Sequence, residues 1–206
     1  ENPVYEQLAC KFFEHFIYIA VAMDRIGIHN DELWDEEDGF FYDVLRLPNA
    51  ESMRMKVRSM VGLVPLFATA VFADEIFEKL PTFRERAGYF ARQRTTLMTE
   101  INHPLETGVQ GRHLLAPFNA KKLRRILKHM LDESEFLSSY GIRALSRYHG
   151  DHPYIFTVEG HVYRVDYEPA ESSTGLFGGN SNWRGPIWMP VNVLLIQSLR
   201  RLYTYY

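Results

Sequence analysis

Five segments of this chain repeat apolar residues every three or four positions, the spacing of one face of an α-helix, and this pattern limits the fold more than any other feature. The segments are residues 4–26, 61–80, 82–101, 121–133 and 188–206. Gly27 follows the first segment, Pro81 separates the second from the third, and Asn119 stands where an N-cap would precede the fourth. The pattern predicts a mainly α fold.

Turn-forming residues interrupt the helical pattern and predict small β-hairpins in the loops. Residues 33–47 are aromatic and acidic around the turn signal Asp38-Gly39, and residues 53–57 form a further extended run, so we expect one or two hairpins there. Residues 155–167 alternate about Glu159-Gly160 and predict another hairpin.

Composition excludes several classes of protein. An apolar content of 46% supports a core and excludes a disordered chain. The longest weakly polar run, residues 61–73, contains Gly62 and Pro65 and is shorter than the about 20 residues that span a bilayer, so we expect no membrane partner. A net charge of −3 and a pI near 6.3 give no basic field for nucleic acid. Cys10 is the single cysteine and no signal peptide is recognisable, so we expect a cytoplasmic protein.

The string Gly-Asn-Ser-Asn-Trp-Arg-Gly-Pro-Ile-Trp at residues 179–188 is the sharpest motif. Trp183 and Trp188 flank Arg184 and a Gly-Pro bend, so a rigid turn would present two flat faces and a fixed cation. Sugar rings stack on indoles, and a guanidinium can hold two hydroxyls or orient a carboxylate. The alternative is that both tryptophans anchor the last helix in the core.

Together with Tyr-Gly-Ile-Arg-Ala-Leu-Ser at 140–146 and Leu-Trp-Asp-Glu-Glu-Asp-Gly-Phe-Phe-Tyr-Asp at 33–43, this string resembles glycoside hydrolase family 63. That family includes processing α-glucosidase I, bacterial α-glucosidases and mannosylglycerate hydrolases. The resemblance implies an (α/α)6 toroid and inverting hydrolysis without a metal or cofactor. It implies that a sugar pocket is lined by Trp183, Arg184 and Trp188, and that its rim includes Trp34, Tyr42 and Asp43.

The family's general acid and general base motifs are not found in residues 1–206, and five long helices would fill about half of such a ring. We therefore expect a single region that is a fragment of a larger catalytic domain. The parent enzyme would be α-glucosidase-like and would act on oligosaccharides or on glucosyl or mannosyl conjugates. Its partners would be a carbohydrate substrate and the remainder of the polypeptide. The contrasting hypothesis is a noncatalytic helical module that binds carbohydrate or protein.

Seven carboxylates lie between residues 31 and 43, and Asp35, Glu36 and Asp38 are the candidates for proton transfer within this chain. Inverting hydrolysis needs two carboxyl groups about 6.5–9.5 Å apart, but a solvated acidic turn is the default for clustered carboxylates. Arg143 is a candidate substrate-binding residue that either orients a carboxylate or caps the preceding helix.

Two further patterns, the acidic spacing and a basic helix face, do not predict a binding site. The acidic spacing does not fit a calcium loop, and there is no His-Glu-x-x-His motif, so we expect no metal. Basic side chains cover one face of the helix at 121–133, which we expect to be an ordinary solvated face. These side chains are Lys121, Lys122, Arg124, Arg125 and Lys128.

Overall fold

A computed structural model describes residues 3–24, 31–49, 51–175 and 182–206. The chain forms two compact units. The first consists of Glu1–Glu32, Pro65–Leu123 and Leu195–Tyr206, and the second of Leu33–Val64 and Arg124–Leu194. Three of the four boundaries fall inside the 3-10 helix η1 (Met60–Phe67) and the helices α5 (Ala120–Met130) and α6 (Met189–Tyr205), and the other lies between Glu32 and Leu33.

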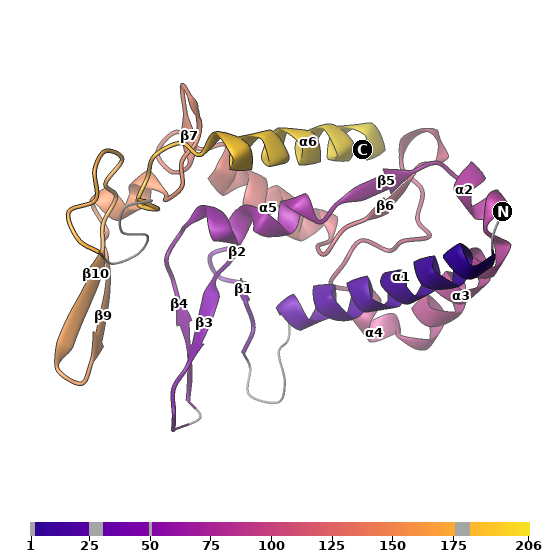
Figure 1. Cartoon of the computed structure of the whole chain (residues 1–206), viewed down its shortest axis with the longest axis horizontal. Coiled ribbons are helices and arrows are strands. Elements are labelled where there is room, and N and C mark those ends of the chain that lie inside the picture. The colour runs from indigo at the N-terminus through magenta and orange to yellow at the C-terminus, as the bar shows by residue number, and fades with distance from the viewer. Residues whose placement is uncertain (1–2, 25–30, 50, 176–181) are drawn as a thin grey trace. The chain divides into compact units, whose positions relative to one another are not determined.

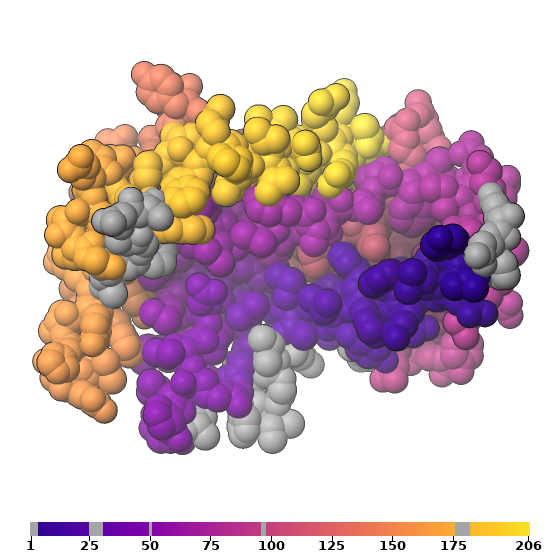
Figure 2. Space-filling model, viewed as in Figure 1, coloured from indigo at the N-terminus to yellow at the C-terminus, as the bar shows by residue number. Residues whose placement is uncertain are grey.

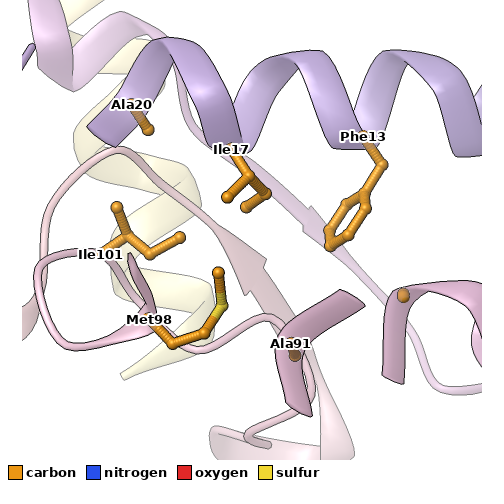
Figure 3. Close-up of a cluster of buried hydrophobic side chains, with 7 residues drawn as sticks. Phe13, Ile17, Ala20, Ala91, Met98 and Ile101 are labelled. Carbon is orange, nitrogen blue, oxygen red and sulfur yellow. The ribbon is translucent and has the colours of Figure 1, made fainter. Parts of the chain in front are cut away.

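In the first unit, helix α1 (Pro3–Asp24) packs against α3 (Pro81–Gln93) (Figure 1). Phe13, Ile17 and Ala20 are about one turn apart and therefore share one face of α1, where they point toward Ala91 and the residues after it (Figure 3). Burial of this apolar surface stabilises the unit by roughly 25 cal/mol for each Å² removed from water. The unit also contains α2 (Glu75–Lys79), α4 (Thr95–Met98), η2 (Val109–Gly111) and the antiparallel pair β5 (Ala70–Phe72) and β6 (His113–Leu115).

The described residues of the second unit form four antiparallel hairpins and η3 (Arg147–Gly150). The hairpins are β1 (Trp34–Asp35) with β2 (Phe40–Phe41), β3 (Asp43–Arg46) with β4 (Ser52–Met55), β7 (Leu137–Ser138) with β8 (Gly141–Ile142), and β9 (Tyr154–Val158) with β10 (His161–Val165). Phe40 and Phe136 are fully buried and stack with ring centroids 5.6 Å apart. Glu159 and Gly160 have φ values of 51° and 78°, as the tight turn of a two-residue hairpin requires.

The expectation of a mainly α fold as part of an (α/α)6 toroid is wrong. The described residues form five two-stranded antiparallel sheets in addition to the helices, so the fold is mixed. The helix expected at 61–80 is replaced by η1, β5 and the short α2. Gly62 and Pro65 disfavour an α-helix, and residues 70–72 gain ladder hydrogen bonds with 113–115 instead.

Several local predictions are confirmed. Helices α1, α5 and α6 cover most of 4–26, 121–133 and 188–206, whereas the helix at 82–101 is divided at Arg94 into α3 and α4. Asn119 caps α5, because its Oδ1 accepts the Lys122 N–H at 2.9 Å. The expected stop at Gly27 lies outside the described residues. None of the described helices is long and apolar enough to cross a membrane.

The basic side of α5 is not simply a solvated face, which corrects the prediction. In the first unit, Lys122 is buried, and its ammonium group forms ion pairs with Asp24 and, at 2.9 Å, with Glu100. In the second unit, Arg125 pairs with Glu36 at 3.3 Å. Three of the five basic residues are exposed: Lys121, Arg124 and Lys128. The burial of Lys122 and its two ion-pair partners could not be read from the helical period alone.

Candidate functional site

The β1–β2 hairpin carries the three candidate carboxylates, and Asp35 is buried among cations. Its carboxylate accepts the Asp38 N–H at 2.8 Å and pairs with Arg54 at 2.8 Å and Lys56 at 3.1 Å. Burial raises the pKa of Asp35, but the Asp38 N–H and Lys56 outweigh burial and hold that pKa below its usual range. An ionised carboxylate held in this way is a poor proton donor, because a general acid at neutral pH needs a raised pKa.

Asp38 and Tyr42 belong to the same cluster. The Tyr42 hydroxyl donates to Asp38 Oδ2 at 2.9 Å, and Asp38 also pairs with Lys56 at 3.2 Å and with Arg58 at 3.6 Å. Tyr42 is buried, and burial raises the pKa of its phenol. Two cations therefore compensate the Asp38 charge, and Tyr42 acts as a neutral hydrogen-bonding group.

Trp34 and Glu36 form a separate contact at the edge of this cluster. Trp34 is buried against Phe41, with ring centroids 4.9 Å apart, and its Nε1–H donates to Glu36 at 2.7 Å. The Arg125 guanidinium lies 5.7 Å from the Trp34 ring. Asp43 lies on β3 with an exposed side chain. The structure therefore brings Trp34, Asp35, Glu36, Asp38 and Tyr42 together in and around one hairpin.

Arg58 lies at the centre of this cluster and is not among the residues predicted from the sequence. The guanidinium of Arg58 pairs with Glu135 at 3.1 Å, donates to the Tyr42 hydroxyl at 3.2 Å, and lies 4.3 Å over the Tyr148 ring. The backbone N–H of Arg58 donates to His149 Nε2 at 2.9 Å. A signal was present, because Arg54, Lys56 and Arg58 alternate like one face of a strand that follows an acidic turn.

Glu135 and His129 extend the cluster onto α5. The two side chains share a 2.7 Å hydrogen bond, and Glu135 also accepts the Ser146 hydroxyl at 3.2 Å. The hydrogen bond to Glu135 raises the pKa of His129. Burial raises the pKa of Glu135, but the hydrogen bonds from His129 and Ser146 and the charges of His129 and Arg58 together outweigh burial, and the net pKa is lowered. The pair is therefore held in its charged form.

We expect the His129–Glu135 pair to stabilise the protein most between about pH 4.5 and 6.5. Because the folded pKa of His129 is raised, its contribution is complete below the unfolded value of 6.5 and is lost as pH rises through the folded pKa. Because the folded pKa of Glu135 is lowered, its contribution is complete above the unfolded value of 4.5 and is lost as pH falls through the folded pKa. Urea unfolding at pH values from below 4.5 to above 6.5 measures both declines. His129→Asn should flatten the alkaline decline, whereas His161→Asn, at an exposed histidine, should preserve it. An unchanged decline in His129→Asn would contradict the prediction.

Trp183 and Trp188 form an aromatic pair at the start of α6. Their ring centroids lie 4.7 Å apart at an angle of 41°, and both side chains are half-buried. The Trp188 Nε1–H donates to the Asn182 carbonyl at 3.3 Å. Part of each indole is therefore accessible to solvent, and the rest of each ring packs against the protein. The first three residues of the motif, 179–181, lie outside the described residues.

Arg184 is 2% exposed and holds the segment that follows β10. Its guanidinium pairs with Glu168 at 3.2 Å, donates to the Thr174 hydroxyl at 3.0 Å and to the Thr174 carbonyl at 2.7 Å, and contacts Ser172. Its Nε–H has no acceptor within the described part of the chain. Burial and these contacts give Arg184 a positioning role, and its contact with sugar stays a prediction.

Arg143 holds the loop that follows α5. Its Nη1 donates to the carbonyl oxygens of Glu133 and Glu135 at 3.2 Å each and to that of Leu137. Its Nε donates to the Tyr167 hydroxyl at 3.1 Å. These carbonyl groups follow the last residue of α5, Met130, so they are not the cap of that helix, and a role of Arg143 toward a substrate carboxylate stays a prediction.

Backbone pairing connects these groups within the second unit. Ser59 forms an antiparallel bridge with Leu145, and Arg143 forms one with Ile187. The segment 143–146 therefore lies between the backbone that carries Arg58 and the backbone that follows Trp183. In the described residues, no three His, Cys, Asp or Glu side chains converge as metal ligands would.

Comparison with known proteins shows similarity to parts of longer chains. No family model matches this chain. Over its full length, it is 42% identical to Uncharacterized protein YMR196W of Saccharomyces cerevisiae, of which it spans 20%. Two further relatives match over 90 residues, which are 43% of this chain and 8% of each relative. The chain is 32% identical to the mannosyl-oligosaccharide glucosidase of Saccharomyces cerevisiae and 34% identical to the probable mannosyl-oligosaccharide glucosidase of Schizosaccharomyces pombe. The chain is therefore partially homologous to mannosyl-oligosaccharide glucosidases, and it spans a fifth or less of each relative.

Proposed function

We propose that this chain is a sugar-binding part of an α-glucosidase-like glycoside hydrolase. The substrate class is an oligosaccharide or a glucosyl or mannosyl conjugate. The observation that carries the proposal is the pair of half-buried indoles, Trp183 and Trp188, held 4.7 Å apart on a buried support. Aromatic faces bind the C–H faces of sugar rings, and the partial similarity to two mannosyl-oligosaccharide glucosidases supports the same substrate class.

In this proposal, Arg184 and Asn182 position the indoles. Arg184 holds Glu168 and Thr174, while the Asn182 carbonyl accepts the Trp188 Nε1–H at 3.3 Å. A preorganised stacking face aligns the ring before reaction, which lowers the entropic cost of reaching the transition state.

The proposal assigns no proton transfer to Asp35 or Asp38. Both carboxylates are compensated by Lys56 and an arginine, and the lowered pKa of Asp35 opposes the role of a general acid. Hydrolysis with inversion needs an acid and a base on opposite sides of the bond. In our proposal, both are carboxyl groups elsewhere in the polypeptide that carries this chain.

The test replaces each tryptophan with alanine in the polypeptide that carries this chain. We expect Trp183→Ala and Trp188→Ala to lower kcat/KM for an α-glucoside by about 10–100-fold, because a contact that orients the ring in the transition state is lost. Tyr203→Ala, which removes an 86% exposed aromatic ring from α6, is the control and should leave kcat/KM unchanged.

Urea unfolding of the same variants separates sugar stacking from a core role. If the indoles are core anchors, their removal should lower the free energy of unfolding by about 3–5 kcal/mol while turnover by the folded fraction persists. That result would contradict the proposal. Arg184→Lys keeps the charge but loses the planar fork of donors, so it should lower kcat/KM if the position of the loop matters.

A further inference from the structure

The second unit contains an apolar cleft of about 350 Å³ between the β3–β4 and β9–β10 hairpins. Figure 2 shows the two hairpins at the surface, in purple and orange, with a groove between them. Met55 and Val57 line one side, and Phe156, Tyr163 and Val165 line the other. None of these side chains belongs to the Arg58 cluster or to the Trp183–Trp188 pair. The volume falls within the range of roughly 300–1,000 Å³ that is typical of small-molecule sites.

Strand alternation explains why one face of the β9–β10 hairpin is aromatic. Phe156 pairs with Tyr163 across the two strands, so both side chains leave the sheet on the same face, and their rings stack 6.4 Å apart at 29°. Ile155 and Val162 belong to the opposite face and are 54% and 66% exposed. The two faces of one hairpin therefore provide a test and a matched control.

Asp43 is the one carboxylate among the residues that line the cleft. Its side chain is exposed, and no described side chain forms an ion pair with it. In this respect it differs from Asp35 and Asp38 nearby in sequence, which are both compensated by cations. A carboxylate without a cation beside an apolar wall can accept a hydrogen bond from a bound hydroxyl group.

We propose that this cleft binds an apolar ring that bears a hydroxyl group, such as a phenol or an alicyclic alcohol. The ring packs between Phe156 and the Met55–Val57 side, and its hydroxyl donates to Asp43. A hexose fits less well, because it would bring several hydroxyl groups to a wall with few polar partners, and each unpaired hydroxyl costs free energy. The link to catalysis rests on the proposed function, in which this ring is the aglycone of the glycoside conjugate.

Binding is tested on the 206-residue chain by NMR titration with phenol, and with maltose for comparison. We expect saturable binding of phenol, weakened about tenfold or more by Phe156→Ala and changed less than about twofold by Ile155→Ala. Val57→Phe fills the cleft from the other hairpin and should abolish binding even if Phe156→Ala disturbs β9. Asp43→Asn should weaken the binding of phenol more than the binding of toluene, which has no hydroxyl group to donate.

Three results would overturn the inference. They are the absence of saturable phenol binding, equal effects of Phe156→Ala and Ile155→Ala, and displacement of phenol by maltose at lower concentration. The last result would make the cleft a sugar subsite.

A second measurement separates this inference from the proposed function. In the polypeptide that carries this chain, KM for phenyl α-glucoside should lie below KM for methyl α-glucoside, and Phe156→Ala should remove the difference. Absence of hydrolysis with phenol binding intact would contradict the proposed function alone. Hydrolysis without a phenyl preference and without phenol binding would contradict the cleft assignment alone.

Discussion

Glu135→Ala is expected to lower the free energy of unfolding by about 2–4 kcal/mol, somewhat less than the loss of one partner from a fully buried ion pair. Only 13% of the Glu135 side chain is exposed. Its carboxylate forms ion pairs with Arg58 at 3.1 Å and His129 at 2.7 Å, and it accepts a hydrogen bond from the Ser146 hydroxyl at 3.2 Å. Removing it leaves the Arg58 guanidinium, itself 15% exposed, with less of its charge compensated. Uncompensated charge away from water accounts for most of the expected loss.

Urea unfolding near pH 6 measures this effect, because both members of the His129–Glu135 pair are charged there. Glu133→Ala is the control, since Glu133 lies two residues before Glu135 and is exposed, so stability should not change. The free energy of unfolding of Glu135→Gln should fall between those of Glu135→Ala and Glu133→Ala, because the amide keeps an acceptor but loses the charge. Equal stability of Glu135→Ala and Glu133→Ala would show that the Arg58 cluster does not stabilise the second unit.

Gly62→Ala is expected to destabilise the second unit by about 3 kcal/mol, at the upper end of overpacking effects. A Cβ atom at Gly62 would lie 2.3 Å from Phe40 Cε1 and 2.4 Å from the Phe41 carbonyl oxygen. Phe40 is fully buried and stacks on Phe136, so its ring has no free space to move into. The carbonyl belongs to the backbone of β2 and can move only with that strand.

Gly175→Ala is the matched control, because a Cβ atom there meets no atom of the described residues within 4 Å. The measurement is the midpoint and slope of urea unfolding for both variants. A Gly62→Ala midpoint equal to that of the unsubstituted chain would mean that η1 does not pack against β2 as the structure describes.

Local signals in the sequence were sufficient for several elements. Asn119 predicted the start of α5, and its Oδ1 accepts the Lys122 N–H at 2.9 Å. Glu159-Gly160 predicted the β9–β10 turn, where both residues have positive φ. These two predictions are confirmed because the determining interactions join residues that are close in sequence, so backbone preference and structure agree.

For the candidate site, the sequence identified the residues of the acidic hairpin and the tryptophan pair, but not what surrounds them. Asp35 and Asp38 were visible as carboxylates, whereas Arg58, which meets Asp38 and Glu135, was not identified. The Arg58–Glu135 contact joins residues 77 positions apart. The sequence contains both charges, but only folding places them within reach of each other.

By itself, the sequence determined α1, α5 and α6, the hairpins within residues 33–57 and 155–167, and the acidic and tryptophan residues of the candidate site. Tertiary structure decided that residues 70–72 pair with 113–115 rather than continue a helix, and that the fold is mixed rather than mainly α. It also decided that Lys122 is buried between Asp24 and Glu100 instead of facing solvent. The physical reason is the same in each case: burial and long-range pairing outweigh a helix preference worth a fraction of about 1 kcal/mol for each residue, and that competition is settled only when distant segments meet.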